Sequence, residues 1–138
     1  MFLEGSFGKK LDILKRYMDV SLIRNEVISN NIANSDTPNF KRTDVTFEAQ
    51  LKRALDSEKT ETIPALLSDK RHIAFDHPVD YREVQPKRVL DYLTTAKNNG
   101  NNVDIETETM NFMENQLMYQ TVAQVIQGRF NNVQLVLR

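Results

Sequence analysis

Residues 105–137 read IETETMNFMENQLMYQTVAQVIQGRFNNVQLVL and form the most regular stretch of the chain. Their apolar side chains recur in alternating steps of four and three, and one position recurs every seven residues without a break. This period is typical of a coiled-coil helix. The predicted seam contains Ile105, Phe112, Gln116, Tyr119, Ala123, Ile126, Phe130, Val133 and Leu137.

A single helix over residues 105–137 is too long for a chain of this size to enclose. At 1.5 Å per residue it measures roughly 50 Å. A compact chain of 138 residues has a diameter of only roughly 37 Å. Between Asn115 and Gly128 the polar positions hold Asn, Gln and Thr and no charged residue, although solvated helices normally carry Lys and Glu. We therefore expect this helix to project and to pack against other protein surfaces.

The ends of this helix carry charges that suit the helix dipole. Glu106 and Glu108 stand at its start and Arg129 near its end, and this role accounts for the two carboxylates. Either Asn102 or Asp104 can act as the N-cap. Gly128 is tolerable in so long a helix and leaves room for the close approach of a neighbour.

A second long helix is predicted near the N-terminus, from Lys9 to Ala33. Its apolar residues form two adjacent lines, which make the apolar sector too wide for a helix with one neighbour. The first line is Leu11, Leu14, Met18, Leu22, Ile28 and Ile32, and the second is Ile13, Tyr17, Val20, Ile23 and Val27. Ser21 and Asn25 interrupt the first line, and buried polar residues of this kind set the register between helices. The helix should stop near Asn34, because Pro38 disfavours helical geometry at the residue before it.

The charges are concentrated in the middle of the chain. Of its 37 charged residues, 10 lie in residues 1–40, 21 in residues 41–97 and 6 in residues 98–138. The net charge of −1 argues against a non-specific nucleic-acid binder, which needs an excess of Lys and Arg. We predict three parts within one structural domain: a helical arm with its turn (1–40), a charged, mostly irregular insertion (41–101) and a coiled-coil helix (102–138). Phe47, Leu51 and Leu55 mark a short helix in the insertion, capped by Asp44 or Thr46, and no sheet is expected.

The sequence holds no recognisable catalytic or metal-binding pattern. It contains no cysteine, which excludes a disulfide framework and a thiolate metal site. His72 and His77 flank Asp76, but their spacing does not suit a metal site on a helix, and we interpret them as surface residues. We expect no enzyme activity, no cofactor, no metal and no small-molecule substrate. No signal peptide or membrane-spanning stretch is predicted.

Residues 29–41, SNNIANSDTPNFK, resemble the signature of the flagellar axial proteins (rod, hook and hook-associated subunits), which typically reads A-N-N-I-A-N-x-x-T-P-G-Y-K. Asn39 replaces a glycine and tolerates the left-handed backbone that such a turn often needs, whereas Phe40 loses the tyrosine hydroxyl. Residues 100–106, GNNVDIE, resemble the pattern that opens the last helix of the proximal rod proteins. The signature turn comprises Asn30, Asn31, Ile32, Ala33, Asn34, Thr37, Pro38, Asn39, Phe40 and Lys41.

The resemblance implies a mainly α fold, in which long N- and C-terminal helices form an antiparallel coiled-coil-like pair with a small, largely irregular middle insertion. It implies a structural subunit of the proximal rod of the bacterial flagellar basal body. Such a subunit is exported by the flagellar type III apparatus without a cleaved signal peptide. The implied partners are further copies of the chain, other rod subunits, and proteins of the export gate and of the membrane ring at the rod junction.

The implied assembly is a tube in the periplasmic space that connects the export gate and membrane ring to the distal rod and transmits torque. The residues expected to pack between subunits are Leu11, Leu14, Met18, Leu22, Ile28, Ile32, Phe112, Tyr119, Ala123, Ile126, Phe130, Val133 and Leu137. The alternative is a soluble helical adaptor or secretion chaperone that binds a partner helix. Such a protein would carry charged outer faces, in contrast to the uncharged stretch from Asn115 to Gly128.

Overall fold

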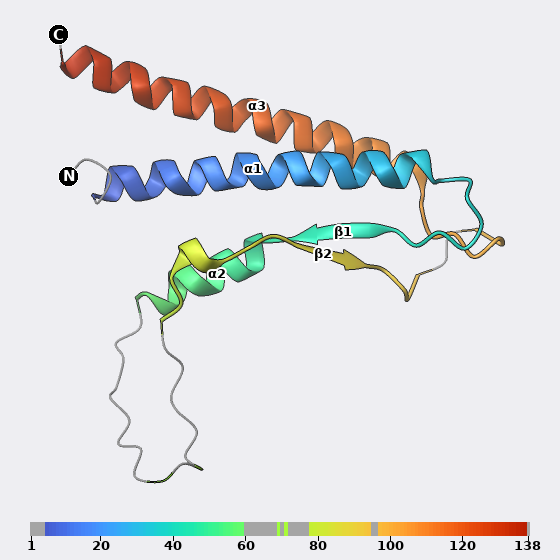
Figure 1. Cartoon of the computed structure of the whole chain (residues 1–138). Helices are drawn as coiled ribbons and strands as arrows, with labels where there is room; N and C mark the ends of the chain where they lie inside the picture. The colour runs from blue at the N-terminus through green and yellow to red at the C-terminus, as the bar shows by residue number, and fades with distance from the viewer. Residues whose placement is uncertain (1–4, 60–68, 70, 72–77, 95–96, 138) are drawn as a thin grey trace. The chain divides into compact units, whose positions relative to one another are not determined.

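Two long helices dominate the computed structural model, which describes residues 5–59, 69, 71, 78–94 and 97–137. Helix α1 spans Ser6–Ala33 and helix α3 spans Ile105–Val136. They pack against each other and run antiparallel, with the start of α1 and the end of α3 at the same end of the pair (Figure 1). The predicted mainly α fold, with its paired terminal helices, is confirmed.

Helix α1 ends where the sequence predicts. Its last residue is Ala33, and the side-chain amide of Asn34 donates to the carbonyl oxygen of Asn30 at 2.8 Å. That carbonyl belongs to the last turn, where backbone acceptors lack a full set of partners within the helix. Asn39 follows with a φ of 60°, so the predicted left-handed conformation is also confirmed.

Helix α3 begins at the predicted cap but does not bury the whole predicted seam. The Asp104 side chain accepts from the backbone N–H of Glu106, which makes it the N-cap. One heptad row of the seam is half-buried: Phe112, Tyr119, Ile126 and Val133. The exposed members of the predicted seam are Ile105, Gln116, Phe130 and Leu137. The two buried residues of α3 are Glu108 and Asn115, so the buried row is offset from the predicted one.

The prediction that the chain contains no sheet is wrong. Strands β1 (Thr43–Thr46) and β2 (Lys87–Leu90) pair in a two-stranded sheet. Their directions are opposite (Figure 1). The backbone N–H of Asp91 donates to the carbonyl oxygen of Arg42 at 2.8 Å just beyond the strand ends. With four residues each, these strands are too short to show a lasting alternation of apolar and polar residues.

The predicted short helix in the insertion is present as α2, Glu48–Ser57. Its N-cap residue is Phe47, without a side-chain cap bond, so the predicted cap at Asp44 or Thr46 is wrong. Asp44 instead accepts from the backbone N–H of Val45. A 3-10 helix, η1 (Tyr81–Glu83), contacts α2.

Two compact units can be distinguished, Met1–Val45 with Arg88–Arg138, and Thr46–Lys87. The buried apolar residues of the first unit are Val20, Val27, Ile28, Val45 and Val103. Those of the second unit are Phe47, Ala54, Tyr81 and Val84. The division into parts at residues 40 and 101 stays a prediction. Among the described residues, no helix has the length and apolar character required to span a membrane.

Candidate functional site: the junction of the two long helices

The chain segments that follow α1 and precede α3 are bound together by asparagine side chains. We call residues 34–43 and 97–104 the junction. Its centre is Asn101, which has no exposed surface. The Asn101 amide nitrogen lies within 3.0 Å of three carbonyl oxygens, those of Asn34, Ser35 and Thr37. Its amide oxygen accepts from the backbone N–H of Val103 at 2.6 Å. One side chain therefore fixes the signature turn to the start of α3.

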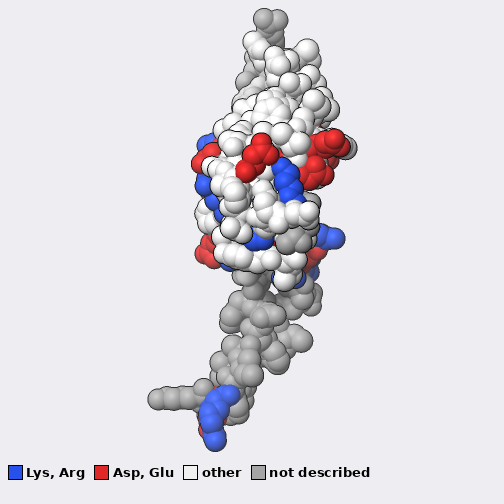
Figure 2. Space-filling model, turned by 90° about the vertical axis from the view of Figure 1, so that its right-hand side faces the viewer, with Lys and Arg blue, Asp and Glu red and all other residues white. Residues whose placement is uncertain are grey.

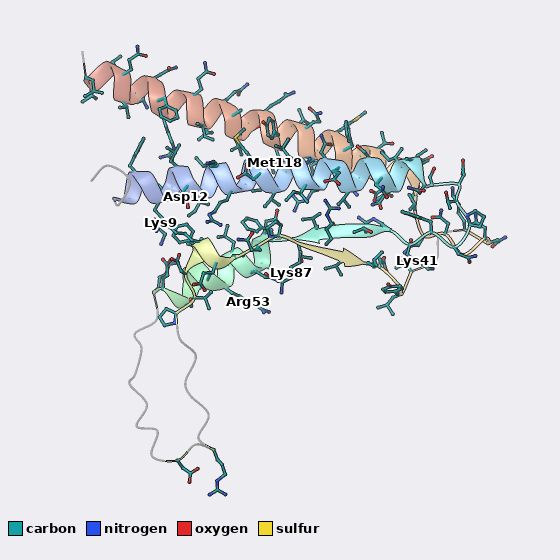
Figure 3. The ribbon with its side chains drawn as sticks, in the orientation of Figure 1. Lys9, Asp12, Lys41, Arg53, Lys87 and Met118 are labelled. Atoms are coloured by element: carbon teal, nitrogen blue, oxygen red, sulfur yellow. The ribbon has the colours of Figure 1, made fainter. Side chains whose placement is uncertain are left out.

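Two lysines reinforce this attachment. The Lys97 ammonium donates to the carbonyl oxygen of Ser35 at 2.8 Å and contacts the Asp36 carboxylate at 3.2 Å. Lys41, labelled in Figure 3, donates to the carbonyl oxygen of Gly100 at 2.9 Å. A cation beside the C-terminal carbonyls of a helix is favourable because of the helix dipole. Lys97 therefore stabilises the end of α1 while it holds the two segments together.

A close backbone approach completes the junction. The backbone N–H of Asn39 donates to the carbonyl oxygen of Asn99 at 3.1 Å. Gly100 has a φ of 79°, and a Cβ added to it would lie 2.6 Å from the Asn39 side-chain oxygen. Glycine fits this position because it adopts a left-handed backbone at no steric cost. Asn102 adds a cross-link, since its side-chain oxygen accepts from the backbone N–H of Arg42.

A buried carboxylate lies next to the junction. Glu108 is 1% exposed, and its carboxylate accepts from the Arg42 Nε at 2.6 Å and from the Asn31 amide at 3.0 Å. Asn31 also bonds both the backbone N–H and the carbonyl oxygen of Thr43. Glu108 was interpreted from the sequence as a dipole partner at the helix start, which is a role for a solvated residue. The burial of its carboxylate corrects that interpretation.

The pair of charges is mutually stabilised. Burial by itself would lower the pKa of Arg42, but the hydrogen bond and the negative charge of Glu108 outweigh it, so the pKa of Arg42 lies above its ordinary value. A buried charge needs both a partner and hydrogen bonds to be tolerated. The Glu108 carboxylate has both, and it links α3 to Asn31 of α1 and to Arg42, the residue before β1.

A second polar contact lies one heptad further along α3. The Ser21 hydroxyl donates to the Asn115 side-chain oxygen at 2.8 Å, and the Asn115 amide donates back to the Ser21 carbonyl oxygen at 2.9 Å. Both residues are buried. The predicted burial of a polar residue at Ser21 is confirmed. Asn115 was expected to meet other protein surfaces, but it binds α1 of the same chain.

The other predicted polar break in α1, Asn25, has a different environment. It is half-buried, and its side-chain oxygen has no hydrogen-bond partner among the described residues. Asn25 therefore makes no contact comparable to the one between Ser21 and Asn115.

Helix α3 exposes large apolar side chains on more than one side. Nine large apolar residues of this helix expose more than two fifths of their surface: Ile105, Met110, Met113, Leu117, Met118, Val125, Phe130, Leu135 and Val136. On the face of the molecule seen in Figure 2, no blue or red side chains are visible toward the top, where α3 ends. A soluble monomer seldom leaves so long an apolar surface open.

The residues predicted to pack between subunits occupy different environments. Ile28 is buried, Leu22 and Phe130 are each 55% exposed, and Leu137 is 77% exposed. The rest are half-buried: Leu11, Leu14, Met18, Ile32, Phe112, Tyr119, Ala123, Ile126 and Val133. Their role between subunits stays a prediction.

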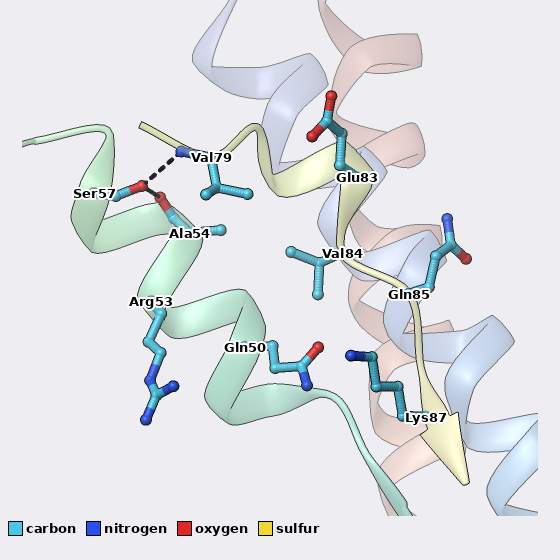
Figure 4. A pocket seen from close by; sticks show the side chains of 9 residues that line it. All are labelled: Gln50, Arg53, Ala54, Ser57, Val79, Glu83, Val84, Gln85 and Lys87. Atoms are coloured by element: carbon cyan, nitrogen blue, oxygen red, sulfur yellow. Dashed lines mark hydrogen bonds between the residues drawn. The ribbon is translucent and has the colours of Figure 1, made fainter. Parts of the chain in front are cut away.

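A pocket in the second unit offers no alternative site. Residues of α2, of η1 and of the segments next to η1 line it (Figure 4). The Ser57 hydroxyl, which lines this pocket, already makes two hydrogen bonds. It donates to the Ala54 carbonyl oxygen at 2.7 Å and accepts from the backbone N–H of Val79 at 3.1 Å. The carboxylate among the side chains that line the pocket belongs to Glu83, which is exposed. A nucleophile needs a base within hydrogen-bonding reach, and this pocket provides none among its described side chains.

No group of three or more metal-ligating side chains occurs within the described parts of the chain. His72 and His77, which we interpreted as surface residues, lie outside the described residues.

The junction contacts of Asn101 and Asn102 were not predicted from the sequence, where Asn102 was considered only as a possible N-cap. These two residues carry the central contacts of the junction. The available signal was the resemblance of residues 100–106 to the opening of a rod protein's last helix. The role of Arg42 was not predicted from the sequence.

Comparison with known proteins identifies the family. The family model described as "Flagella basal body rod protein" matches residues 21–41, which include the signature turn. The chain is 40% identical to the flagellar basal body rod protein FlgB of Borrelia hermsii, over 96% of this chain and 98% of that protein. The chain belongs to the FlgB family of flagellar basal body rod proteins. FlgB of Bacillus subtilis is 34% identical, over 95% of each chain.

The comparisons confirm the predicted resemblance and extend it over nearly the whole chain. FlgB of Borreliella burgdorferi is also 40% identical, over 97% of this chain and 99% of its own length. These relatives are named as rod proteins and not as enzymes. The chain is therefore a component of the flagellar basal body rod.

Proposed function

We propose that this rod component is a subunit of the proximal rod, where copies of it and other rod subunits pack through their terminal helices into a tube. The tube connects the export gate and membrane ring to the distal rod and transmits torque through packing alone. The subunit reaches the periplasmic space through the flagellar type III apparatus. Membership in the FlgB family is the basis of this proposal.

The observation that carries the proposal is the exposed apolar surface of α3. Leu117 is 64% exposed and Met110 is 71% exposed in the single chain. Burial of such side chains releases about 25 cal/mol per Å² of apolar surface. Neighbouring subunits would provide that burial, and their packing would offset the cost of ordering the distal part of the helix.

Leu117→Asp tests this proposal, because Leu117 is exposed in the single chain. In the isolated subunit the new carboxylate stays in water and should leave folding unchanged. In a packed tube it would be a buried, unpaired charge, which is strongly unfavourable. We expect normal expression and export, no assembled rod in purified basal bodies, and no motility in a strain whose own copy of the gene is deleted.

Ala49→Asp is the matched control. Ala49 is exposed and lies in the first turn of α2, where a negative charge is favourable. This variant should swim normally. Normal motility of Leu117→Asp would contradict the proposal. It would favour the soluble adaptor or chaperone, whose exposed surface need not be buried in a rod.

A further inference from the structure

Helix α3 is apolar on more than one side, so hydrophobic burial alone does not determine which side packs against α1. Phe112 and Tyr119 are half-buried, while Met110, Met113 and Leu117 expose more than three fifths of their surface. All five side chains would gain from burial by about the same amount per unit area. Another feature must select the orientation of α3.

The polar residues of α3 provide that feature. Its only two buried residues are Glu108 and Asn115, and every residue of α3 is described. They are seven residues apart and therefore lie on the same side of the helix. If α3 turned its opposite side toward α1, the carboxylate and the amide would move away from their partners, and the polar groups of those partners would be left under an apolar surface. Buried polar groups without partners are costly.

The partners of these two residues are specific and lie on α1 or directly after it. Glu108 binds Asn31 at 3.0 Å and Arg42 at 2.6 Å. Asn115 binds Ser21 through two hydrogen bonds of 2.8 and 2.9 Å. Each contact is satisfied in one rotation and one axial position of α3 only.

The side left outward follows from the same geometry. Met110 is two residues after Glu108, and Leu117 is two residues after Asn115. Two residues turn an α-helix by about 200°, so Met110 and Leu117 lie nearly opposite the buried polar side. Met113 lies between them on the same side. We call Met110, Met113 and Leu117 the outer stripe.

We propose that Glu108 and Asn115 are specificity-determining residues, which turn one side of α3 toward α1 and keep the outer stripe free for a neighbouring subunit of the rod. Apolar residues at these two positions would still pack, but they would allow α3 to turn the outer stripe inward. The identity of the neighbour rests on the proposed function. The choice of side is a property of the single chain.

The test measures which side of α3 is accessible in the isolated full-length chain. The sequence contains no cysteine, so Leu117→Cys and Tyr119→Cys each create a unique thiol, one on the outer stripe and one on the inner side. The reaction rate with a water-soluble maleimide is measured for each. In the natural background the Leu117→Cys thiol should react several-fold faster than the Tyr119→Cys thiol.

The decisive background replaces both polar contacts by apolar ones, with Ser21→Ala, Arg42→Met, Glu108→Leu and Asn115→Leu. Substitution of Ser21 and Arg42 together with Asn115 and Glu108 avoids an orphaned buried charge or hydroxyl. The Asn31 amide loses Glu108 but keeps its hydrogen bond to the Thr43 carbonyl oxygen. We expect helix content by circular dichroism to be retained and the ratio of the two rates to fall toward one. A retained ratio would overturn the proposal, because another feature would then select the side of α3.

Three further backgrounds test whether the change in the ratio of rates is specific to the two buried polar contacts. Glu106→Leu with Gln116→Leu changes two exposed residues of α3 and should leave the ratio unchanged. Glu108→Gln keeps hydrogen-bonding atoms toward Asn31 and Arg42 and should also preserve it. Ser21→Ala with Asn115→Leu, which keeps the Glu108 contacts, should give an intermediate ratio.

Loss of helix in the decisive background would contradict the proposal as well, since the polar residues would then hold the helices together rather than select a side. The rates are measured without any rod. The result of this test therefore does not depend on the motility of Leu117→Asp.

Discussion

The two ends of the helix pair are built from different interactions. At the junction end, Asn101, Asn102 and Glu108 are buried, and each has several hydrogen bonds to distant parts of the chain. Beyond Asn115, the side-chain hydrogen bond found in the described part of α3 is that of Thr121 to its own helix. The polar groups of the junction end are paired within the chain, whereas the distal end of α3 has large apolar side chains that stay exposed.

This difference separates folding from assembly. Polar contacts need defined distances and angles, so they give the junction one arrangement before any partner arrives. Apolar contacts are less directional and suit a surface that meets neighbouring subunits. Substitutions at the junction should therefore reduce the stability of the isolated chain, and substitutions on the distal part of α3 should act mainly on assembly.

The largest stability effect is expected for Glu108→Ala. This change leaves the Arg42 guanidinium and the Asn31 amide without the carboxylate, and loss of one partner of a buried ion pair costs about 3 to 5 kcal/mol. Arg42 is partly exposed, with 26% of its side chain accessible, so we expect the lower end of that range. Urea unfolding followed by circular dichroism measures the loss.

Glu106→Ala is the control for Glu108→Ala. Glu106 is exposed in the first turn of α3, so it should lose only a dipole interaction of about 0.3 to 1 kcal/mol. Equal losses in the two variants would mean that the buried contacts of Glu108 add nothing to stability. The contrast between the junction and the distal part of α3 would then be wrong.

A pair of glycines offers the same substitution in both regions. Gly100→Ala, in the junction, forces alanine into a left-handed backbone and pushes its Cβ against Asn39, which should cost about 1 to 2 kcal/mol. Gly128 lies within α3, and a Cβ there would meet nothing within 4 Å. Gly128→Ala should therefore stabilise the isolated helix by about 0.5 to 1 kcal/mol.

Urea unfolding of both alanine variants checks the opposite signs. Gly128→Ala has a second readout, because the sequence indicates that this glycine allows a neighbour to approach closely. A more stable isolated chain with impaired rod assembly would support that role. Destabilisation by Gly128→Ala would show that the site is enclosed within the single chain. It would contradict the proposed difference between the junction and the distal part of α3.

The sequence predicted features that depend on neighbours along the chain. The two helices, the end of α1 near Asn34, the Asp104 cap and the left-handed Asn39 all follow from periodicity or from the chemistry of a few adjacent residues. The contacts that distinguish the two ends were not predictable in this way. Ser21 and Asn115 are 94 residues apart, and Asn31 and Glu108 are 77 apart.

A glutamate in the first turn of a helix is usually solvated, so its sequence position predicts a dipole role rather than burial. The sheet was missed for a related reason. All four residues of β2 are exposed, so its sequence carries no apolar alternation that would mark a strand.

The smallest effect concerns the start of α3 and depends on pH. The Thr107 hydroxyl donates to the Asp104 carboxylate at 2.7 Å, and the backbone N–H of Glu106 donates at 3.1 Å. These hydrogen bonds hold the pKa of Asp104 below its ordinary value near 3.8. A carboxylate with a lowered pKa stabilises the folded chain above its unfolded pKa and loses that effect as the pH falls through its folded value.

Asp104→Asn should therefore be less stable than the natural chain at pH 7, and the difference should shrink below about pH 4, where the unfolded carboxyl group gains its proton. The exposed Asp19→Asn controls for the change in net charge. Because the cap lies beside the junction, acid should weaken the start of α3 and leave the distal part of that helix unaffected. The backbone amide signals of Glu106 and Gln127, followed by NMR during the titration, would show whether acid affects only the start of α3. A simultaneous response of both signals would mean that α3 responds as one unit and that its two ends are not independent.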